Sequence, residues 1–370
     1  MSTSQPAAAS APRPKVFGNL LAEVVRKDSC TGCGSCAATC PVFAIQMEEG
    51  KPKLAGVCLA CQVCYNSCPV ASLDLPQVEA KALGRARTAE EPIGVYKAIY
   101  TVRAKSPDVL SKCQDGGAVT TLLQQFFDDG GDGAVITGAE EGKPWSPKPL
   151  VITSKQEVLA GAGTKYTPSP TMLGVASAVK DYHLSRLAVV GTPCQIRAMR
   201  KIESSEKTNV KIRDAIKMRI GLFCTESFSY AALMEFLAGK GVKPTDVTKF
   251  QIKSGKFTAT RGSEVVYEAK VTELNSLVRP CCHTCADFSA ELADISVGSV
   301  GSAEGWSTVI VRTEAGETLL KDAEKAGLLD VKPIEEGKAG AGAVRRLSEF
   351  KRKRGTTEKV ETASTPVQGN

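Results

Sequence analysis

Short apolar runs bounded by glycine or proline alternate with longer amphipathic stretches from Val95 onward. The apolar runs predict strands at 95–104, 132–140, 149–154, 186–193 and 218–224, with a last strand at 307–313. The amphipathic stretches predict helices at 116–129 and 193–204, with a last helix at 316–327. Because strands alternate with helices, we expect an α/β domain with a mixed or mostly parallel sheet.

A different pattern precedes this domain, because eight of the 14 cysteines fall in two short runs. The runs read DSCTGCGSCAATCPVFAIQ and GVCLACQVCYNSCPVASL, and both follow C-x2-C-x2-C-x3-C-P, as in bacterial two-cluster ferredoxins. There, three cysteines of one run bind one 4Fe-4S cluster and the fourth, before proline, binds the other. The sequence therefore predicts one cluster at Cys30, Cys33, Cys36 and Cys68, and a second at Cys58, Cys61, Cys64 and Cys40.

Zinc sites and disulfides are the alternatives for these eight cysteines. Zinc usually takes paired C-x2-C ligands in a closed site, which leaves no reason for two identical runs ending in Cys-Pro. A disulfide framework suits small secreted proteins, whereas no apolar signal segment opens this sequence. We therefore expect a reducing, cytosolic setting in which the thiols are available for metal.

The length of 370 residues predicts two or three domains. We expect a disordered arm at 1–20, a small α+β two-cluster ferredoxin domain at 21–76, a polar linker at 77–94, the α/β domain at 95–350, and a basic, disordered tail at 351–370. The tail adds to a net charge of +7, and docking to a partner is the alternative to simple solvation. No apolar run could span a membrane, no nucleic-acid-binding motif accompanies the charge, and Rossmann and P-loop glycine motifs are missing.

Six further cysteines belong to the α/β domain. Cys194 and Cys224 each close a predicted strand unit, and Cys282 with Cys285 forms C-x2-C. Since the ends of adjacent strands share one rim of a sheet, these four thiols could converge there and hold a third 4Fe-4S cluster. Zinc ligation and burial as core thiols are the alternatives.

The two remaining cysteines and the two histidines are not predicted to form a site of their own. Cys281 could replace Cys282 as a ligand if the turn shifts by one residue, and Cys113 is expected to be a wall residue. We expect His183 and His283 to be surface or packing residues, so the chemistry should not depend on a histidine base.

Longer motifs in the α/β domain are similar to those of a known family. They are SKCQDGGAVTTLL, GTKYTPSPT, VVGTPCQIRAMR, IGLFC and RPCCHTCADFSAELADISVGSVGSAEGWSTVIVRTEAGETLL. In this order, over about residues 95–330, they resemble the coenzyme F420 hydrogenase beta-subunit family. With the preceding two-cluster domain, the whole chain resembles the input subunit of F420H2 dehydrogenases. The resemblance implies an FAD-binding domain that takes hydride from the reduced deazaflavin and passes single electrons to iron-sulfur clusters.

The resemblance also implies site residues. Cys194, Cys224, Cys282 and Cys285 would hold the cluster nearest the flavin. The flavin and deazaflavin pocket would be formed by Ser111, Gly116, Gly117, Ala118, Val119, Thr120, Lys165 and Tyr166. The two glycines open a predicted helix, where free amides and the helix dipole favour a phosphate, although the pair could be only a turn. Lys165 offers a charge for an anionic ring or phosphate, and its alternative is a solvated lysine.

We therefore predict an α/β flavin domain with a mixed sheet, preceded by a small α+β two-cluster ferredoxin domain. The protein would carry three 4Fe-4S clusters and FAD, oxidise F420H2, and deliver electrons to other subunits of a redox complex or to a free ferredoxin; the reverse direction is equally allowed. We expect it in the cytoplasm, reaching a membrane only through a partner. The alternatives are a non-catalytic electron-transfer subunit, a reductase of another substrate such as 7-hydroxymethyl chlorophyll, and a zinc-bound structural protein.

Overall fold

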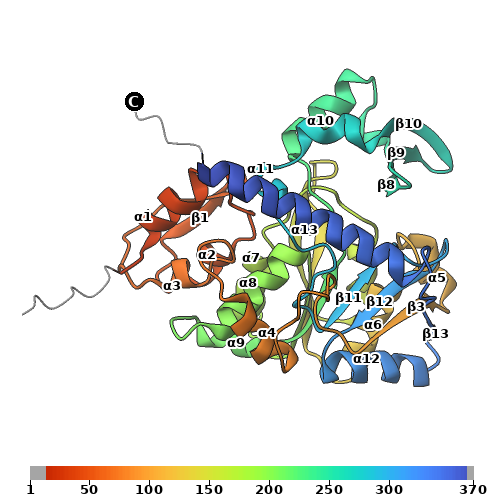
Figure 1. Ribbon diagram of the computed structural model, residues 1–370, viewed down its shortest axis with the longest axis horizontal. Coiled ribbons are helices and arrows are strands. Elements are labelled where there is room, and N and C mark those ends of the chain that lie inside the picture. Colours follow the sequence, from red (N-terminus) through yellow and green to blue (C-terminus); the bar gives the residue numbers. More distant parts are fainter. Residues whose placement is uncertain (1–13, 365–370) are drawn as a thin grey trace, which may run out of the picture.

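The computed structural model describes residues 14–364 and consists of three packed parts (Figure 1). The first part holds both ferredoxin-like cysteine runs and contains only short elements. These are α1 (Phe17–Leu20), η1 (Leu21–Val25), α2 (Ser35–Ala38), β1 (Ile45–Glu48), β2 (Lys51–Leu54) and α3 (Val63–Asn66). Strands β1 and β2 form an antiparallel hairpin in which Ile45 pairs with Leu54. We call this part the two-cluster domain.

The second part is built on an eight-stranded mixed sheet in the order β13-β3-β12-β11-β7-β6-β4-β5. Three neighbouring pairs, β11 with β7, β7 with β6 and β6 with β4, are parallel, and the outer pairs are antiparallel. The mixed sheet predicted from the sequence is confirmed. The strands are β3 (Ala98–Ala104), β4 (Gly133–Ala139), β5 (Pro147–Ile152), β6 (Leu187–Gly191), β7 (Ile216–Leu222), β11 (Ile295–Gly298), β12 (Ser307–Val311) and β13 (Leu329–Pro333).

Helices cover both faces of this sheet, and the alternation of buried side chains assigns each strand residue to one face. On β4, Ile136 belongs to the apolar core under α6 (Ala118–Asp128) and α12 (Glu314–Lys325). Its neighbour Val135 belongs to the opposite core, under α7 (Thr171–Lys180), α8 (Pro193–Ser204) and α9 (Val210–Ala215). Because Cys33 and Ala38 join the second core, the two-cluster domain packs on the α7/α8 side of the sheet.

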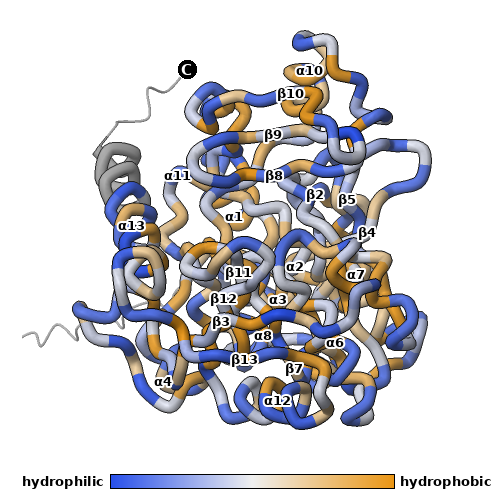
Figure 2. The backbone as a smooth tube through the Cα atoms, turned by 90° about the vertical axis from the view of Figure 1, so that its right-hand side faces the viewer, coloured by the Kyte–Doolittle hydropathy of each residue, from blue (hydrophilic) through white to orange (hydrophobic). Residues whose placement is uncertain are grey.

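The third part is an insert between β7 and β11 that the sequence did not predict. It contains α10 (Tyr230–Gly239), η3 (Pro244–Asp246), β8 (Lys249–Lys253), β9 (Lys256–Arg261), β10 (Glu264–Lys270) and η4 (Val271–Leu277). Phe228, Phe250 and Phe257 form its core, and the rings of Phe250 and Phe257 stack 5.4 Å apart. Figure 2 shows the insert projecting beyond the large sheet, with both polar and apolar positions along its strands.

The structure corrects three predicted boundaries. Phe17 and Leu20 are buried in α1, so the arm predicted at 1–20 is already folded there, while residues 1–13 lie outside the described part. Helix α4 (Leu75–Leu83) extends into the predicted linker. Asp74 caps this helix, because its side chain accepts a hydrogen bond from the amide of Gln77. The predicted tail forms α13 (Ala341–Ser364), and residues 365–370 lie outside the described part. Strand β13 and α13 also follow what was predicted to be the last helix.

One buried carboxylate explains why the linker and the tail are ordered. Glu291 lies in the loop before β11 and pairs with Arg87 of the linker segment and, at 2.6 Å, with Arg352 of α13. Arg87 also pairs with the buried Glu79 of α4. Since a charge removed from water must be paired, each segment is held by its partner in the core.

Further short elements are α5 (Pro107–Lys112), η2 (Lys155–Gly161) and α11 (Pro280–His283). Within residues 14–364, no helix combines the length and the apolar character that crossing a bilayer would require.

Candidate iron-sulfur and flavin sites

The first predicted cysteine quartet lines one cavity in the two-cluster domain. Cys30, Cys33, Cys36 and Cys68 surround it together with Val24 and Met47. Gly32 and Gly34 adopt positive φ angles of 68° and 81°, which turn the loop around the cavity. A side chain at Gly34 would press on Pro170 and Leu173, so the turn is also held against the large domain.

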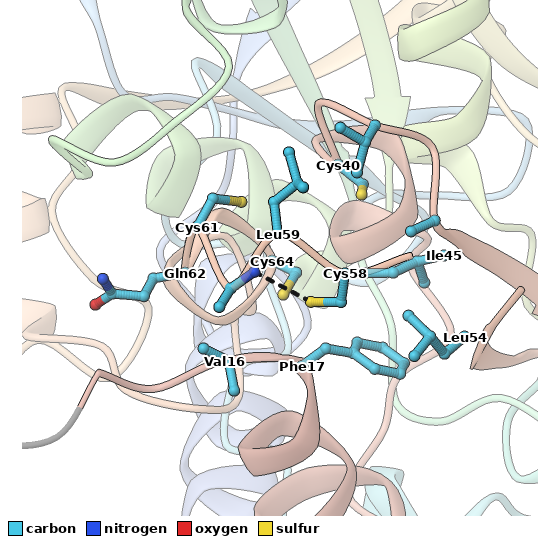
Figure 3. A pocket seen from close by; sticks show the side chains of 13 residues that line it. Val16, Phe17, Cys40, Ile45, Leu54, Cys58, Leu59, Cys61, Gln62 and Cys64 are labelled. Carbon is cyan, nitrogen blue, oxygen red and sulfur yellow. Dashed lines mark hydrogen bonds between the residues drawn. The ribbon is translucent and has the colours of Figure 1, made fainter. Parts of the chain in front are cut away.

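The second quartet lines a separate cavity (Figure 3). The sulfurs of Cys58, Cys61 and Cys64 face a common space with Cys40 across from them, and the amide of Ala60 donates to Cys58 Sγ at 3.4 Å. Unlike the first quartet, this one reaches the surface, since Cys58 and Cys61 are exposed. The spacing of each run thus brings together the four cysteines that the crossed ferredoxin pattern pairs.

The electrostatics of the thiols follow the same grouping. Burial raises the pKa of Cys36, and the charges of Cys33, Cys68 and Cys30 raise it further. Burial likewise raises the pKa of Cys64 to about 11, with Cys61, Cys58 and Cys40 contributing. Because such crowded thiolates repel one another, a positively charged metal centre is needed to hold them deprotonated together.

The third predicted quartet converges at the edge of the large sheet. Cys194 lies in the first turn of α8 after β6, Cys224 follows β7, and Cys282 and Cys285 lie in and just after α11. Burial raises the pKa of Cys224 to about 12, and the charges of Cys282, Cys194 and Cys285 add to the effect. The four thiols are therefore close enough to interact as one group.

Cys281 is placed differently from Cys282. It is buried and hydrogen-bonds with Cys282, and this bond, together with burial, raises the pKa of the Cys281 thiol. The same bond lowers the pKa of Cys282, with help from the charges of Arg279 and Lys351. Cys282 is thus the member of the pair that favours the thiolate form that metals bind.

The residues present fit 4Fe-4S clusters. Each quartet offers four thiols, and the two N-terminal quartets have the ferredoxin spacing. All 14 cysteines are free thiols in the structure. Among the side chains of residues 14–355, no three cysteine, histidine or carboxylate groups lie as close together as the binding of a single metal ion would require.

Arg279 joins the first and third quartets, and sequence reasoning missed it. Its guanidinium donates to the carbonyl oxygens of Thr31 at 2.9 Å and Cys30 at 3.2 Å. Burial raises the pKa of Cys194, and the nearby Arg279 charge opposes this rise. Cys194 in turn contributes to the raised pKa of Cys33, after burial and the charges of Cys33's own quartet. The position of Arg279 next to Pro280 and the cysteine turn was the available signal.

The glycine pair before α6 serves packing as well as any ligand. The amide of Gly116 donates to Ser307 Oγ at 3.1 Å, so it is not one of the free amides expected there. A side chain on Gly116 would come within 2.5 Å of the Val102 carbonyl, because β3 and β12 pass directly behind it. Gly117 has φ 75° and caps α6. The amides of the next residues, Ala118, Val119 and Thr120, open the helix with no acceptor in the described part of the chain.

The other predicted flavin contacts lie on α5 and in the loop after η2. Ser111 is exposed on α5, and its hydroxyl donates to the Asp108 carbonyl at 2.8 Å. Tyr166 packs in the core of the insert, where its hydroxyl accepts the Ile252 amide at 2.9 Å and burial raises its pKa to about 12. Tyr166 therefore anchors the insert, and its ring is committed to that core.

Lys165 lies in the loop after η2 and is largely removed from water. Its ammonium donates to the carbonyl oxygens of Gly161 and Ala162, both at 3.2 Å, and of Gly163 at 3.4 Å. Burial lowers the pKa of Lys165 to about 8. Among the side chains of residues 14–355, no carboxylate forms an ion pair with it, and burial is the one cause of its lowered pKa, which leaves a buried cation whose natural complement is an anionic ligand.

The insert brings further charge to the loop before α6, which no sequence pattern predicts. Lys249 on β8 donates to the Gln114 carbonyl at 3.2 Å, and the Gln114 amide donates to the Phe250 carbonyl at 3.3 Å. Burial raises the pKa of the neighbouring Asp115, while Lys249 opposes the rise. The loop before α6 is thus bordered by the cations of β8.

Comparisons with known proteins agree with this architecture. Residues 99–176 and 184–337 match the N-terminal and C-terminal parts of the coenzyme F420 hydrogenase/dehydrogenase beta subunit, and residues 23–46 match a 4Fe-4S binding domain. The chain is 40% identical over 265 residues to the beta subunit of coenzyme F420 hydrogenase of Methanothermobacter thermautotrophicus, covering 71% of this chain and 93% of that protein. It is 30% identical over 338 residues to one of the F(420)H(2) dehydrogenase subunits of Methanosarcina mazei, covering 90% and 92%.

A solved structure is also similar. A chain in the F420-reducing NiFe hydrogenase complex from Methanosarcina barkeri superposes with a TM-score of 0.72 at 31% identity, covering 77% of this chain and 98% of that one. The likeness therefore extends over the large sheet and its helices as well as over the sequence. This chain belongs to the coenzyme F420 hydrogenase/dehydrogenase beta-subunit family and carries a 4Fe-4S domain at its N-terminal end.

Proposed function

We propose that this protein is an F420-linked flavo-iron-sulfur oxidoreductase, which exchanges hydride with coenzyme F420 on bound FAD and moves single electrons through three 4Fe-4S clusters to a partner protein. The observation that carries the proposal is the line of three cysteine quartets. The charge of Cys194 in the third quartet contributes to the raised pKa of Cys33 in the first. The charge of Cys64 in the second quartet contributes to the raised pKa of Cys36 in the first. Neighbouring quartets are thus within electrostatic reach along the whole line.

The protein's own part in flavin and deazaflavin binding is to supply positive charge. The free amides of the first turn of α6 can donate hydrogen bonds to a ligand bound in front of the helix, and the helix dipole adds partial positive charge there. Lys249 donates to the Gln114 carbonyl in the loop before α6, and the amide of Thr164, next to Lys165, donates to the Gln114 side-chain oxygen at 3.3 Å. FAD, when bound, supplies the conversion between a two-electron hydride and two single electrons. Phosphates of FAD or F420 are the anions that this arrangement favours.

The far end of the line supports a protein partner. Around the exposed Cys58 and Cys61, five apolar side chains are exposed, among them Val57 at 83% and Leu59 at 63%. The others are Val42, Phe43 and Leu54. Apolar side chains gathered in this way on a surface are typical of an interaction site. Relatives named as hydrogenase and dehydrogenase subunits operate in complexes, which agrees with a partner subunit or a ferredoxin docking here.

The test begins with anaerobically purified full-length protein. Iron and flavin analysis should give ~12 irons, four for each quartet, and one FAD per chain. Titration with F420H2 should bleach the flavin and iron-sulfur absorbance, whereas NADH should not. A protein that has its irons but no flavin, and does not respond to F420H2 after FAD is added, would support the non-catalytic electron-transfer subunit instead.

A cysteine variant tests the route. Cys194→Ala should leave flavin reduction by F420H2 intact and slow reduction of the N-terminal clusters at least tenfold. The wild-type protein is the comparison, because Cys113, which belongs to no quartet, lies against Gly117 at the start of α6 and its replacement could disturb flavin binding. A rate of cluster reduction in Cys194→Ala equal to the wild-type rate would reject the third quartet as a relay.

A further inference from the structure

Helix α13 covers the third quartet, although it lies beyond the family match, which ends at residue 337. Figure 1 shows it crossing the front of the molecule, where it contacts α11. Its basic run at 351–354 was predicted to be solvated. Lys351 is instead 2% exposed, and among residues 14–364 it is one of the largest fully buried side chains.

This run contacts two of the three segments that carry the quartet. Lys351 Nζ donates to the carbonyl oxygen of Cys224. Arg354 pairs with Glu226 at 3.1 Å and donates to the carbonyl of Cys282 at 3.5 Å. At Gly355, an added side chain would lie 3.0 Å from the Cys285 carbonyl, so the helix backbone rests directly on that loop. Helix α13 therefore closes the site from the outside.

This closure has two opposing electrostatic consequences. Excluding water makes the gain of a negative charge on a cluster less favourable, which by itself lowers its reduction potential. The Lys351 ammonium acts in the other direction, because it interacts with the charges of Cys224, Cys285 and Cys282. The buried Asp287 is the carboxylate that also faces this lysine.

We propose that Lys351 is a positioning residue of α13 that raises the reduction potential of the third cluster and keeps it accessible to electrons from the flavin while the helix excludes water. The inference rests on the proposed function only for the presence of that cluster. Without Lys351, a cluster closed by α13 would hold its additional electron much less readily.

The test compares three full-length variants by redox titration with electron paramagnetic resonance. The signal missing from Cys194→Ala identifies the third cluster. Lys351→Met should lower its midpoint potential by ~60 mV or more, which is a tenfold change in a one-electron equilibrium. Lys351→Arg keeps the charge and should stay near wild type. Lys353→Met is the matched control, because Lys353 is exposed two positions along the same helix.

Each outcome decides the inference. An unchanged potential in Lys351→Met with full iron content would overturn it, as would an equal fall in Lys351→Met and Lys351→Arg. If Lys351→Met loses iron from the third site, the midpoint potential of the third cluster is measured in Lys351→Gln instead. The inference then requires that this potential is lower than in the wild type. A wild-type protein without any third-cluster signal would instead overturn the third cluster of the proposed function, which separates the two failures.

Discussion

Raising the pH through 8 should weaken anionic ligand binding next to α6, and Lys165 is the reason. Its ammonium is held by three backbone carbonyls and lacks an ion pair within the described residues, and burial lowers its pKa from an ordinary 10.5 to about 8. An anion that binds beside this cation supplies the missing countercharge. The bound state should therefore restore the pKa of Lys165 toward its ordinary value.

The magnitude follows from the two pKa values. A fall from 10.5 to about 8 corresponds to about 3.4 kcal/mol at about 1.36 kcal/mol for each tenfold change. This value is the largest binding free energy that an anion could gain by pairing with the charged Lys165. Water that reaches the side chain reduces this gain. If the ligand restores the pKa fully, Kd should rise about tenfold between pH 7 and pH 9, because the free protein loses its proton over that interval.

The apoprotein should show the opposite trend. Below pH 8 both folded and unfolded chains carry the Lys165 proton, so the folded state bears the full cost of the buried charge. Between pH 8 and 10.5 the unfolded chain binds more protons, and this contribution to the free energy of unfolding rises with pH. Lys165→Met should accordingly stabilise the apoprotein at pH 7 by ~2 kcal/mol and by much less at pH 10.

Two measurements check this reasoning. FAD affinity of the apoprotein, followed by flavin fluorescence from pH 7 to pH 9, should weaken with pH in the wild type and be nearly constant in Lys165→Met. Denaturant unfolding at pH 7 and pH 10 gives the stabilities. Lys148→Met is the control, since Lys148 is exposed on β5. A wild-type Kd that does not change with pH, or the same slope in Lys165→Met, would refute a role for this charge.

Two further predictions concern the electron path. Arg279→Gln removes charged hydrogen bonds to the Thr31 and Cys30 carbonyls. Stopped-flow absorbance should show severalfold slower reduction of the N-terminal clusters and unchanged flavin reduction, with Arg26→Gln, at an exposed position, as the control. Identical rates of cluster reduction in the two variants would contradict a role of Arg279 as the bridge. Leu59→Asp places a charge on the apolar surface around Cys58; KM for an acceptor ferredoxin should rise several-fold with iron content unchanged, and Val265→Asp on the distant insert should not reproduce the rise.

The cysteine sites were the most predictable part of the molecule, for a physical reason. In the two-cluster domain the spacing fixes local turns such as that at Gly32, and the crossed fourth cysteine follows from the repeat. The third quartet required only that Cys194 and Cys224 end neighbouring strands, and β6 and β7 are paired in the sheet. In both cases a short-range pattern determines which sulfurs meet.

The insert and the buried part of α13 were both missed, for different reasons. Glycines at 255 and 262 do mark the hairpin turns of the insert, so its strands could have been found. The burial of Lys351 could not have been predicted, because a run of basic residues is usually solvated. Here Lys351 is buried because it donates to the carbonyl of Cys224 and lies beside the thiols of the third quartet. The predicted free amide at Gly116 failed for the same reason, since its acceptor, Ser307, lies on β12.

The corrected linker has a consequence for how electrons move. A flexible connection would let the two-cluster domain swing, but Lys81 of α4 donates to the Glu203 carbonyl of α8 at 3.0 Å, and Arg87 pairs with Glu291 in the core. The amide of Met172 also donates to the Cys33 carbonyl at 3.1 Å, inside the first quartet. The first and third quartets are therefore fixed relative to each other by several independent contacts. In the proposed route, transfer between them would require no domain motion, and its rate would depend on this fixed geometry and on the effect proposed for Lys351.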